Sequence, residues 1–101
     1  MEITEVRVNL QDEEVLKAFV SITLDDEFVV RGLKVIQGTE GRFVAMPARK
    51  KKDGTFQDIA HPINRSTRNY LEKVVLAAYD QELLDQGPPL LSEDGADEMS
   101  V

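Results

Sequence analysis

The sequence predicts an α+β fold: a small antiparallel β-sheet of about five strands, packed by one C-terminal α-helix. Two patterns carry this prediction. The residues before Pro62 contain short runs rich in β-branched side chains, in which apolar and polar residues alternate. After Pro62 the apolar residues recur every three or four positions, which is typical of a helix that packs one face on a sheet.

The sheet is expected to begin with two strands separated by a polar turn. In residues 2–10 three apolar side chains alternate with polar ones, whereas Ile3 is out of phase, so we expect a strand with a bulge or a late start. A polar turn at 11–14 follows. Residues 16–24 then show the clearest two-residue period in the chain, which predicts a second strand.

Two hairpins are expected next. The acidic pair 25–26 separates the second strand from the β-rich run 27–36 at a spacing that suits a tight antiparallel turn. Gly32 marks a candidate bulge within that run. The glycine-containing segment 37–41 predicts a further turn before the apolar strand 43–46.

Pro47 is expected to end the pairing of that strand. Residues 48–55 contain four consecutive basic residues and then the turn pair Asp53-Gly54, so we expect an exposed basic loop. The short apolar stretch 56–60 is expected to be a fifth strand.

The helix is expected to begin near Asn64 or Ser66, either of which can accept a hydrogen bond from an unpaired N–H of the first turn. It should end near Leu84, before the helix-stopping sequence 87–89. The acidic and weakly apolar residues 86–101 predict a disordered tail, which leaves one domain over residues 1–85. The apolar stripe of the helix consists of Leu71, Val74, Val75, Ala78 and Tyr79.

Charge is distributed unevenly along the chain. The formal net charge is −7, but seven acidic residues and no basic ones lie from Asp80 onward. Between Gly41 and Lys73 eight basic residues stand against three acidic ones, a local charge of +5. Because a partner meets the local field rather than the net charge, this segment is the expected working surface. Its basic residues are Arg42, Arg49, Lys50, Lys51, Lys52, Arg65, Arg68 and Lys73.

Length and composition limit the other possibilities. A chain of 101 residues has room for one domain of modest stability, which favours an oligomer. It contains no cysteine, which excludes disulfides, thiolate metal sites and cysteine nucleophiles. The N-terminus lacks a secretory signal, and the longest apolar run, 74–79, is far below the ~20 residues that span a bilayer. We therefore expect a cytoplasmic protein.

No pattern predicts an enzyme. His61 is the only histidine, and Asp58 as its orienting group with Ser66 or Thr67 as nucleophile would lack a nucleophile elbow and an oxyanion loop. A structural His61 at the strand-to-helix corner is the better interpretation. The acidic residues of the predicted turns lack calcium-loop spacing, and no glycine-rich loop leads into a helix, so no metal, nucleotide or other cofactor is expected.

The basic residues allow two interpretations. The run 49–52 alone can simply protect a sheet edge from aggregation. Arg65 and Arg68, however, are three residues apart and share a helix face, where their donors lie beside unpaired N–H groups and the positive dipole end. Such a cluster suits a phosphate. The candidate phosphate contacts are Arg49, Lys50, Lys51, Lys52, Arg65, Arg68 and Lys73, and the candidate base contacts are Thr67 and Asn69.

Four separated blocks of sequence occur in an order typical of one known family. They are MEITEVR at 1–7, SITLDDEFVV at 21–30, FVAMP at 43–47, and DIAHPIN at 58–64 followed by Thr67-Arg68. With these blocks the chain resembles the bacterial stage V sporulation protein G (SpoVG) family over residues 1–84, without the tail.

The resemblance implies a cytoplasmic homodimer that binds DNA, and also RNA, as a site-selective regulator linked to septation, cell division, the cell cycle and sporulation. It places the nucleic-acid contacts on residues 49–52 and on Arg65 and Arg68, the surface already indicated by charge. We also expect no membrane partner and no small-molecule substrate. The alternative is a protein-interaction module of the division machinery that captures an acidic partner without binding nucleic acid.

Overall fold

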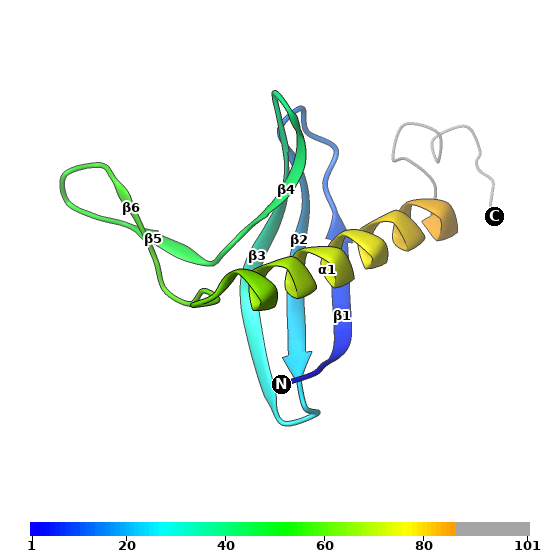
Figure 1. The fold of residues 1–101 in the computed structure, drawn as a ribbon. Coiled ribbons are helices and arrows are strands. Elements are labelled where there is room, and N and C mark those ends of the chain that lie inside the picture. Colours follow the sequence, from blue (N-terminus) through cyan, green and yellow to red (C-terminus); the bar gives the residue numbers. More distant parts are fainter. Residues whose placement is uncertain (87–101) are drawn as a thin grey trace.

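A computed structural model describes residues 1–86, which form the expected α+β fold. A four-stranded antiparallel sheet follows chain order, and the last two strands pair separately as a small hairpin. The helix crosses one face of the sheet, while the small hairpin projects from its side (Figure 1). The predicted disordered tail lies outside the described residues. The elements are β1 (Ile3–Leu10), β2 (Leu16–Leu24), β3 (Phe28–Gly38), β4 (Gly41–Ala45), β5 (Ala48–Lys50), β6 (Phe56–Asp58) and α1 (Arg65–Gln86).

The irregularity predicted at the start of β1 is present. The pairing of β1 with β2 shifts between Ile3 and Glu5, so the strand begins with a bulge. The tight turn between β2 and β3 is also confirmed, since Asp25 and Asp26 have φ angles of 52° and 56°. Positive φ at both central residues gives a turn whose twist matches that of the two strands.

Gly32 lies in a second bulge, as the sequence predicted. Arg31 and Gly32 together oppose a single residue of β2, Ser21. The φ angle of Gly32 is +89°, and a Cβ atom at this position would lie 3.3 Å from the Cβ of Pro47. Both the backbone conformation and the close approach of the chain after β4 therefore favour glycine here.

Part of the predicted basic loop is a strand, which corrects the sequence prediction; Lys51 and Lys52 remain in a turn. Residues 48–50 form β5, which pairs antiparallel with β6, and the predicted fifth strand shortens to 56–58. The turn between them closes where the N–H of Lys51 donates to the carbonyl oxygen of Thr55 at 2.7 Å. Because Pro47 has no N–H for a ladder, the chain leaves the main sheet after β4 and the two short strands pair with each other.

Asn64 caps the helix. The backbone N–H of Thr67 donates to Asn64 Oδ1 at 2.8 Å, and the hydroxyl of Ser66 donates to the same oxygen at 3.0 Å. Of the two capping residues that the sequence allowed, Asn64 is therefore the one used. The helix continues to Gln86, slightly beyond the predicted end at Leu84.

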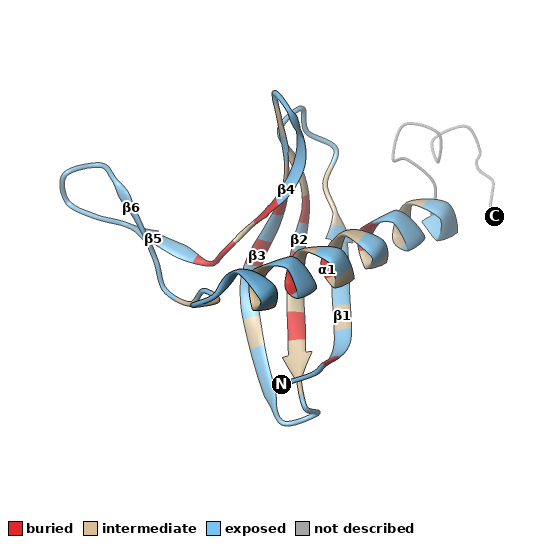
Figure 2. Ribbon diagram, in the orientation of Figure 1, coloured by how far each residue is buried: buried red, intermediate tan, exposed pale blue. Residues whose placement is uncertain are grey.

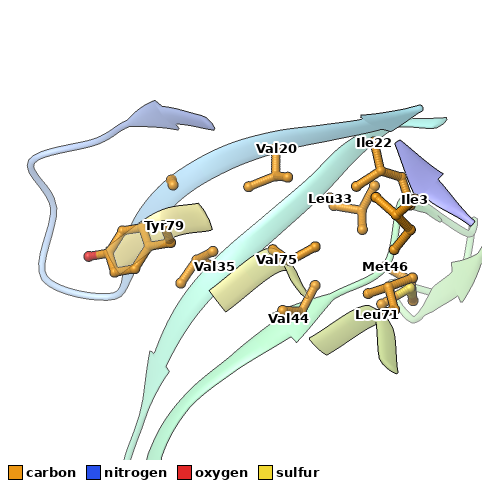
Figure 3. Close-up of a cluster of buried hydrophobic side chains, with 11 residues drawn as sticks. Ile3, Val20, Ile22, Leu33, Val35, Val44, Met46, Leu71, Val75 and Tyr79 are labelled. Atoms are coloured by element: carbon orange, nitrogen blue, oxygen red, sulfur yellow. The ribbon is translucent and has the colours of Figure 1, made fainter. Parts of the chain in front are cut away.

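The hydrophobic core lies between α1 and one face of the sheet (Figure 2). Leu33, Val35 and Val75 are fully buried between the two layers (Figure 3). The helix is also tied to the start of β1, because the N–H of Ile3 donates to the hydroxyl oxygen of Tyr70 at 2.9 Å. The buried side chains are Ile3, Ala18, Val20, Ile22, Leu33, Val35, Val44, Met46, Leu71, Val75 and Tyr79.

Candidate nucleic-acid interface

The first group of predicted contacts lies on the β5–β6 hairpin. Arg49 and Lys50 belong to β5, Lys51 and Lys52 to the turn that follows, and all four are exposed. Successive residues of a strand point to opposite faces, so Arg49 and Lys50 carry charge on the two sides of the hairpin. The hairpin is therefore a positively charged arm that projects from the body of the protein (Figure 1).

The one acidic residue in the turn of this arm is engaged locally. Asp53 Oδ1 accepts hydrogen bonds from the hydroxyl of Thr55 at 2.7 Å and from its backbone N–H at 3.0 Å. These bonds, the hydroxyl first, hold the pKa of the Asp53 carboxyl below its usual range. The carboxylate thus shapes the turn and forms no ion pair with the lysines that precede it in the described residues.

The second group lies at the start of α1. Arg65, Arg68 and Asn69 line an open hollow of about 640 Å³, together with residues 61–64. Arg65 is exposed and Arg68 is half-buried. The first turn of the helix contains no acidic residue, so no carboxylate there neutralises the positive end of the helix dipole. Two guanidinium groups beside this helix end form a concave surface that suits a phosphate.

Two predicted residues stand apart from this hollow. Thr67 is half-buried and lines a different, apolar hollow on the other side of the helix start. Lys73 is exposed two helical turns after Arg65, on the same side as Asn69. The structure therefore brings Arg65, Arg68 and Asn69 together, but it does not bring Thr67 to them.

Among the described residues the predicted phosphate contacts have no acidic partner. Within residues 1–86 ion pairs join Arg7 to Glu5 and Arg42 to Asp80, and no others are formed. All seven cations proposed from the sequence as phosphate contacts are therefore free of intramolecular neutralisation in this part of the chain. A cluster of unneutralised cations is a favourable site for an external anion.

Arg42 belongs to the basic segment of the sequence but not to this surface. Its guanidinium binds Asp80 of α1 through two hydrogen bonds and lies 5.7 Å from the centre of the Tyr79 ring. The hydrogen bond from Arg42 holds the pKa of Asp80 below its usual range, and burial raises the pKa of Tyr79. Arg42 is thus committed to the fold, a contact between distant residues that the sequence did not indicate.

His61 is exposed and has no catalytic partner among the described residues. Its Nδ1 lies 3.0 Å from the carbonyl oxygen of Pro62, to which the Nδ1–H tautomer would donate. No hydrogen bond joins it to Asp58, Ser66 or Thr67 within residues 1–86. In the same part of the chain no cluster of three potential metal ligands occurs, and no helix is long and apolar enough to cross a membrane.

An apolar hollow beneath the helix start was not foreseen from the sequence. It measures about 440 Å³ and lies between the sheet and the segment that leads into α1. Its rim includes Ile63, which is 90 % exposed. No single sequence motif could have indicated it, because its lining comes from the N-terminus, two strands, the segments after β4 and β6, and the helix. Its residues include Met1, Leu24, Val30, Met46, Ala60 and Leu71.

Comparison with known proteins gives one consistent result. The SpoVG family model matches residues 1–81. A protein of Anaeromyxobacter sp. (strain Fw109-5) is 62 % identical over 89 residues, which cover 88 % of this chain and 92 % of the relative. One of Bdellovibrio bacteriovorus is 58 % identical over 92 residues, 91 % of this chain and 85 % of the relative. Both carry the name "Putative septation protein SpoVG". The family suggested by the four sequence blocks is thereby confirmed, and this chain belongs to the SpoVG family.

Proposed function

We propose that the protein is a non-enzymatic, site-selective regulator that binds double-stranded DNA through the start of α1 and the β5–β6 arm, and that it also binds RNA. One observation carries the proposal: Arg65, Arg68 and Asn69 converge on an open hollow at a helix N-terminus with no acidic residue in its first turn. Guanidinium groups and helix N-termini both favour phosphate oxygens. Because the relatives are named for septation, we assign the regulator to that process, and the family resemblance extends the assignment to sporulation.

Different residues contribute in different ways. The cations of the arm and Lys73 contact phosphates and supply affinity that does not depend on sequence. Asn69 lies between Arg65 and Lys73 along one side of the helix, where its amide can pair with a base edge. Thr67 remains a weaker candidate for a base contact, because it lines the apolar hollow instead.

We also propose that the protein acts as a cytoplasmic homodimer. Support comes from the apolar hollow beneath the helix start and from Ile63 on its rim, since an exposed apolar side chain beside an unfilled apolar hollow is typical of an interface. A second copy seated there would bury both. A two-fold axis close to the helix start would also double the basic surface offered to a duplex.

The test is fluorescence anisotropy with random-sequence duplex DNA across a salt series. If four phosphates are neutralised, affinity falls about 100-fold between 50 and 200 mM salt. The variant Arg65→Glu/Arg68→Glu should abolish this binding. The matched control, Arg31→Glu/Lys34→Glu, changes the net charge equally on the opposite face of the sheet and should retain most of it.

Equal losses in both variants would show that only net charge matters, and the helix start would then not be the site. No duplex binding by the unmodified protein at low salt would reject direct DNA recognition. The protein-interaction alternative would then be favoured, with the projecting basic arm as the surface for an acidic partner.

A further inference from the structure

One face of the four-stranded sheet is left uncovered by the described residues. The helix and the core occupy the other face (Figures 1 and 3). Two aromatic side chains on the uncovered face are partly open to solvent: Phe19 is 40 % and Phe43 is 44 % exposed. Such rings offer a flat apolar surface that a ligand can contact from solvent.

The strand register shows what surrounds Phe19. Asn9 of β1 and Lys34 of β3 are its direct partners across the two ladders. Arg7 and the bulged Arg31 belong to the next row, opposite Ser21. Direct partners have Cβ atoms about 5 Å apart and diagonal ones about 7–8 Å. One aromatic ring is therefore surrounded by three cations and two small polar groups.

The surface is hollow at this point. An open depression of about 340 Å³ lies over β1, β2 and the bulge of β3. The bulge contributes to it, because the extra residue in β3 leaves a gap in the ladder and Gly32 has no side chain to fill it. The residues that line it include Arg7, Asn9, Phe19, Ser21, Arg31 and Gly32.

Charge on this face is positive in the middle and negative at the ends. Arg31 and Lys34 form no ion pair within residues 1–86, whereas Arg7 Nε binds Glu5 Oε2 at 2.9 Å. Apart from Glu5, which is paired with Arg7, the acidic residues near the sheet lie before β1 and in the turns 12–14, 25–27 and 39–40, at its two ends. An anionic chain would therefore be attracted to the centre of the face and repelled from both ends, so that it crosses the strands.

We propose that this face binds a single-stranded nucleic acid, with one base stacked on Phe19 and phosphates held by Arg31 and Lys34. Asn9 and Ser21 flank the ring and meet the edge of the stacked base or its sugar. The inference rests on the proposed nucleic-acid function and deepens it: duplexes bind at the helix start, and single strands bind on the opposite side of the sheet.

The choice of a single strand follows from the geometry of the face. The bases of a duplex are stacked inside it and cannot lie flat on a protein ring, whereas unpaired bases can. Every base has a flat face, so stacking on Phe19 tolerates many sequences. Arg31 and Lys34, both on β3 beside the ring, then hold the phosphates, and the polar neighbours add hydrogen bonds.

The test measures binding of fluorescein-labelled octamers of uridine and of thymidine, and of a random duplex, to the full chain. Phe19→Ala should weaken binding of the single strands about 5- to 100-fold, the range expected for loss of one base–aromatic stack. Phe19→Tyr retains a ring and should restore it. The duplex affinity of both variants should be unchanged. The ratio between the two octamers shows whether the ribose hydroxyl contributes.

Two controls make the result specific. Phe28→Ala removes a phenylalanine that is 65 % exposed and outside the hollow, and should leave all affinities unchanged. Arg65→Glu/Arg68→Glu should abolish duplex binding but spare the octamers. If the octamers bind and require Phe19 but the duplex does not bind, the proposed duplex function is rejected and the single-strand site is retained.

Three results would overturn the inference. The first is equal effects of Phe19→Ala and Phe28→Ala on the octamers. The second is loss of octamer binding in Arg65→Glu/Arg68→Glu with no loss in Phe19→Ala, which would show that octamers and duplex bind at the same site, the start of α1. The third is conversion of a dimer to a monomer by Phe19→Ala in sedimentation analysis, because the face would then be the contact between subunits.

Discussion

Arg42 and Asp80 form a two-pronged ion pair that joins β4 to the second half of α1. Arg42 Nη2 donates to Asp80 Oδ2 at 3.0 Å, and Nη1 donates to Oδ1. The guanidinium also lies over the ring of Tyr79, which is part of the core. The pair therefore holds the helix against the sheet at a distance from the candidate interface, whose cations form no ion pair with any other described residue.

This pair should contribute to stability in a pH-dependent way. The pKa of Asp80 lies below its ordinary value of 3.8 in the folded protein. The contribution is therefore fully present above the ordinary value and disappears as the pH falls through the lower, folded-state pKa. Asp80→Asn should destabilise the protein by up to about 1 kcal/mol at pH 7, since the pair is half exposed, and by less at pH 2.5.

Thermal unfolding of both proteins at the two pH values checks this. Asp12→Asn removes an exposed carboxylate that has no ion pair in the described residues, and should change little at either pH. If Asp80→Asn lowers stability by the same amount at both pH values, the effect cannot be assigned to the ion pair.

Asn64→Ala should destabilise the helix start. The substitution removes the acceptor for the Thr67 N–H and for the Ser66 hydroxyl, and loss of such a cap costs about 1 kcal/mol. In a domain of this size the midpoint of thermal unfolding should fall by about 4–8 °C. Asn69→Ala, an exposed position in the same helix, is the control and should leave the midpoint nearly unchanged. Equal shifts in the two variants would refute the cap.

Gly32→Ala should be more destabilising than Gly54→Ala. Both glycines have positive φ, +89° and +93°, so each substitution costs about 1 kcal/mol in backbone strain. Only at Gly32 does the new methyl group also meet another residue, at 3.3 Å from the Cβ of Pro47, whereas nothing lies within 4 Å at Gly54. The difference between the free energies of unfolding of the two variants, measured by chemical denaturation, gives the cost of the contact with Pro47. Identical losses of stability in the two variants would argue against this contact.

The sheet and the helix were largely predictable because their signals are local. The alternation in β2, the turn at Asp25 and Asp26, and the bulge at Gly32 all depend on neighbours in sequence. The β5–β6 hairpin was not predictable in the same way. Its strands have only three residues each, too few to show an alternation of apolar and polar side chains. They pair with each other because Pro47 directs the chain away from the main sheet.

The candidate site was predictable in composition but not in arrangement. Helical spacing correctly grouped Arg65 with Arg68, since positions three apart share a face. It did not show that Thr67 faces the apolar hollow, nor that Arg42 is paired with Asp80, because both depend on packing between distant segments. The surface around Phe19 was missed for the same reason: its residues come from three strands, and only the register brings them together.

Ile63→Asp should weaken or abolish the proposed dimer. Ile63 is 90 % exposed beside the apolar hollow, so in a dimer a carboxylate there would be taken out of water without a partner. Leu84→Asp introduces the same change at an 80 % exposed leucine near the other end of the helix and should leave association intact. Sedimentation velocity over a concentration series measures both. A dimer that persists in Ile63→Asp would place the interface elsewhere.

Removal of the acidic tail should strengthen binding to duplex DNA. Residues 87–101 contain four carboxylates, Glu93, Asp94, Asp97 and Glu98, and they lie outside the described structure. The helix from Arg65 to Gln86 is about 32 Å long, whereas fifteen extended residues reach about 50 Å, so the tail is long enough to return to the basic helix start. There it would compete with phosphates for Arg65 and Arg68.

Two variants test this, one truncated before Gly87 and one with the four tail carboxylates changed to amides. Both should bind duplex DNA more tightly than the unmodified protein at low salt and converge with it at high salt, because screening weakens the competition. Any gain of positive charge raises affinity somewhat, so the control neutralises Asp12, Glu13, Glu14 and Glu40, four exposed carboxylates in the turns of the sheet. A gain in the control as large as in the tail variants would mean that the tail acts only through net charge and does not occupy the site.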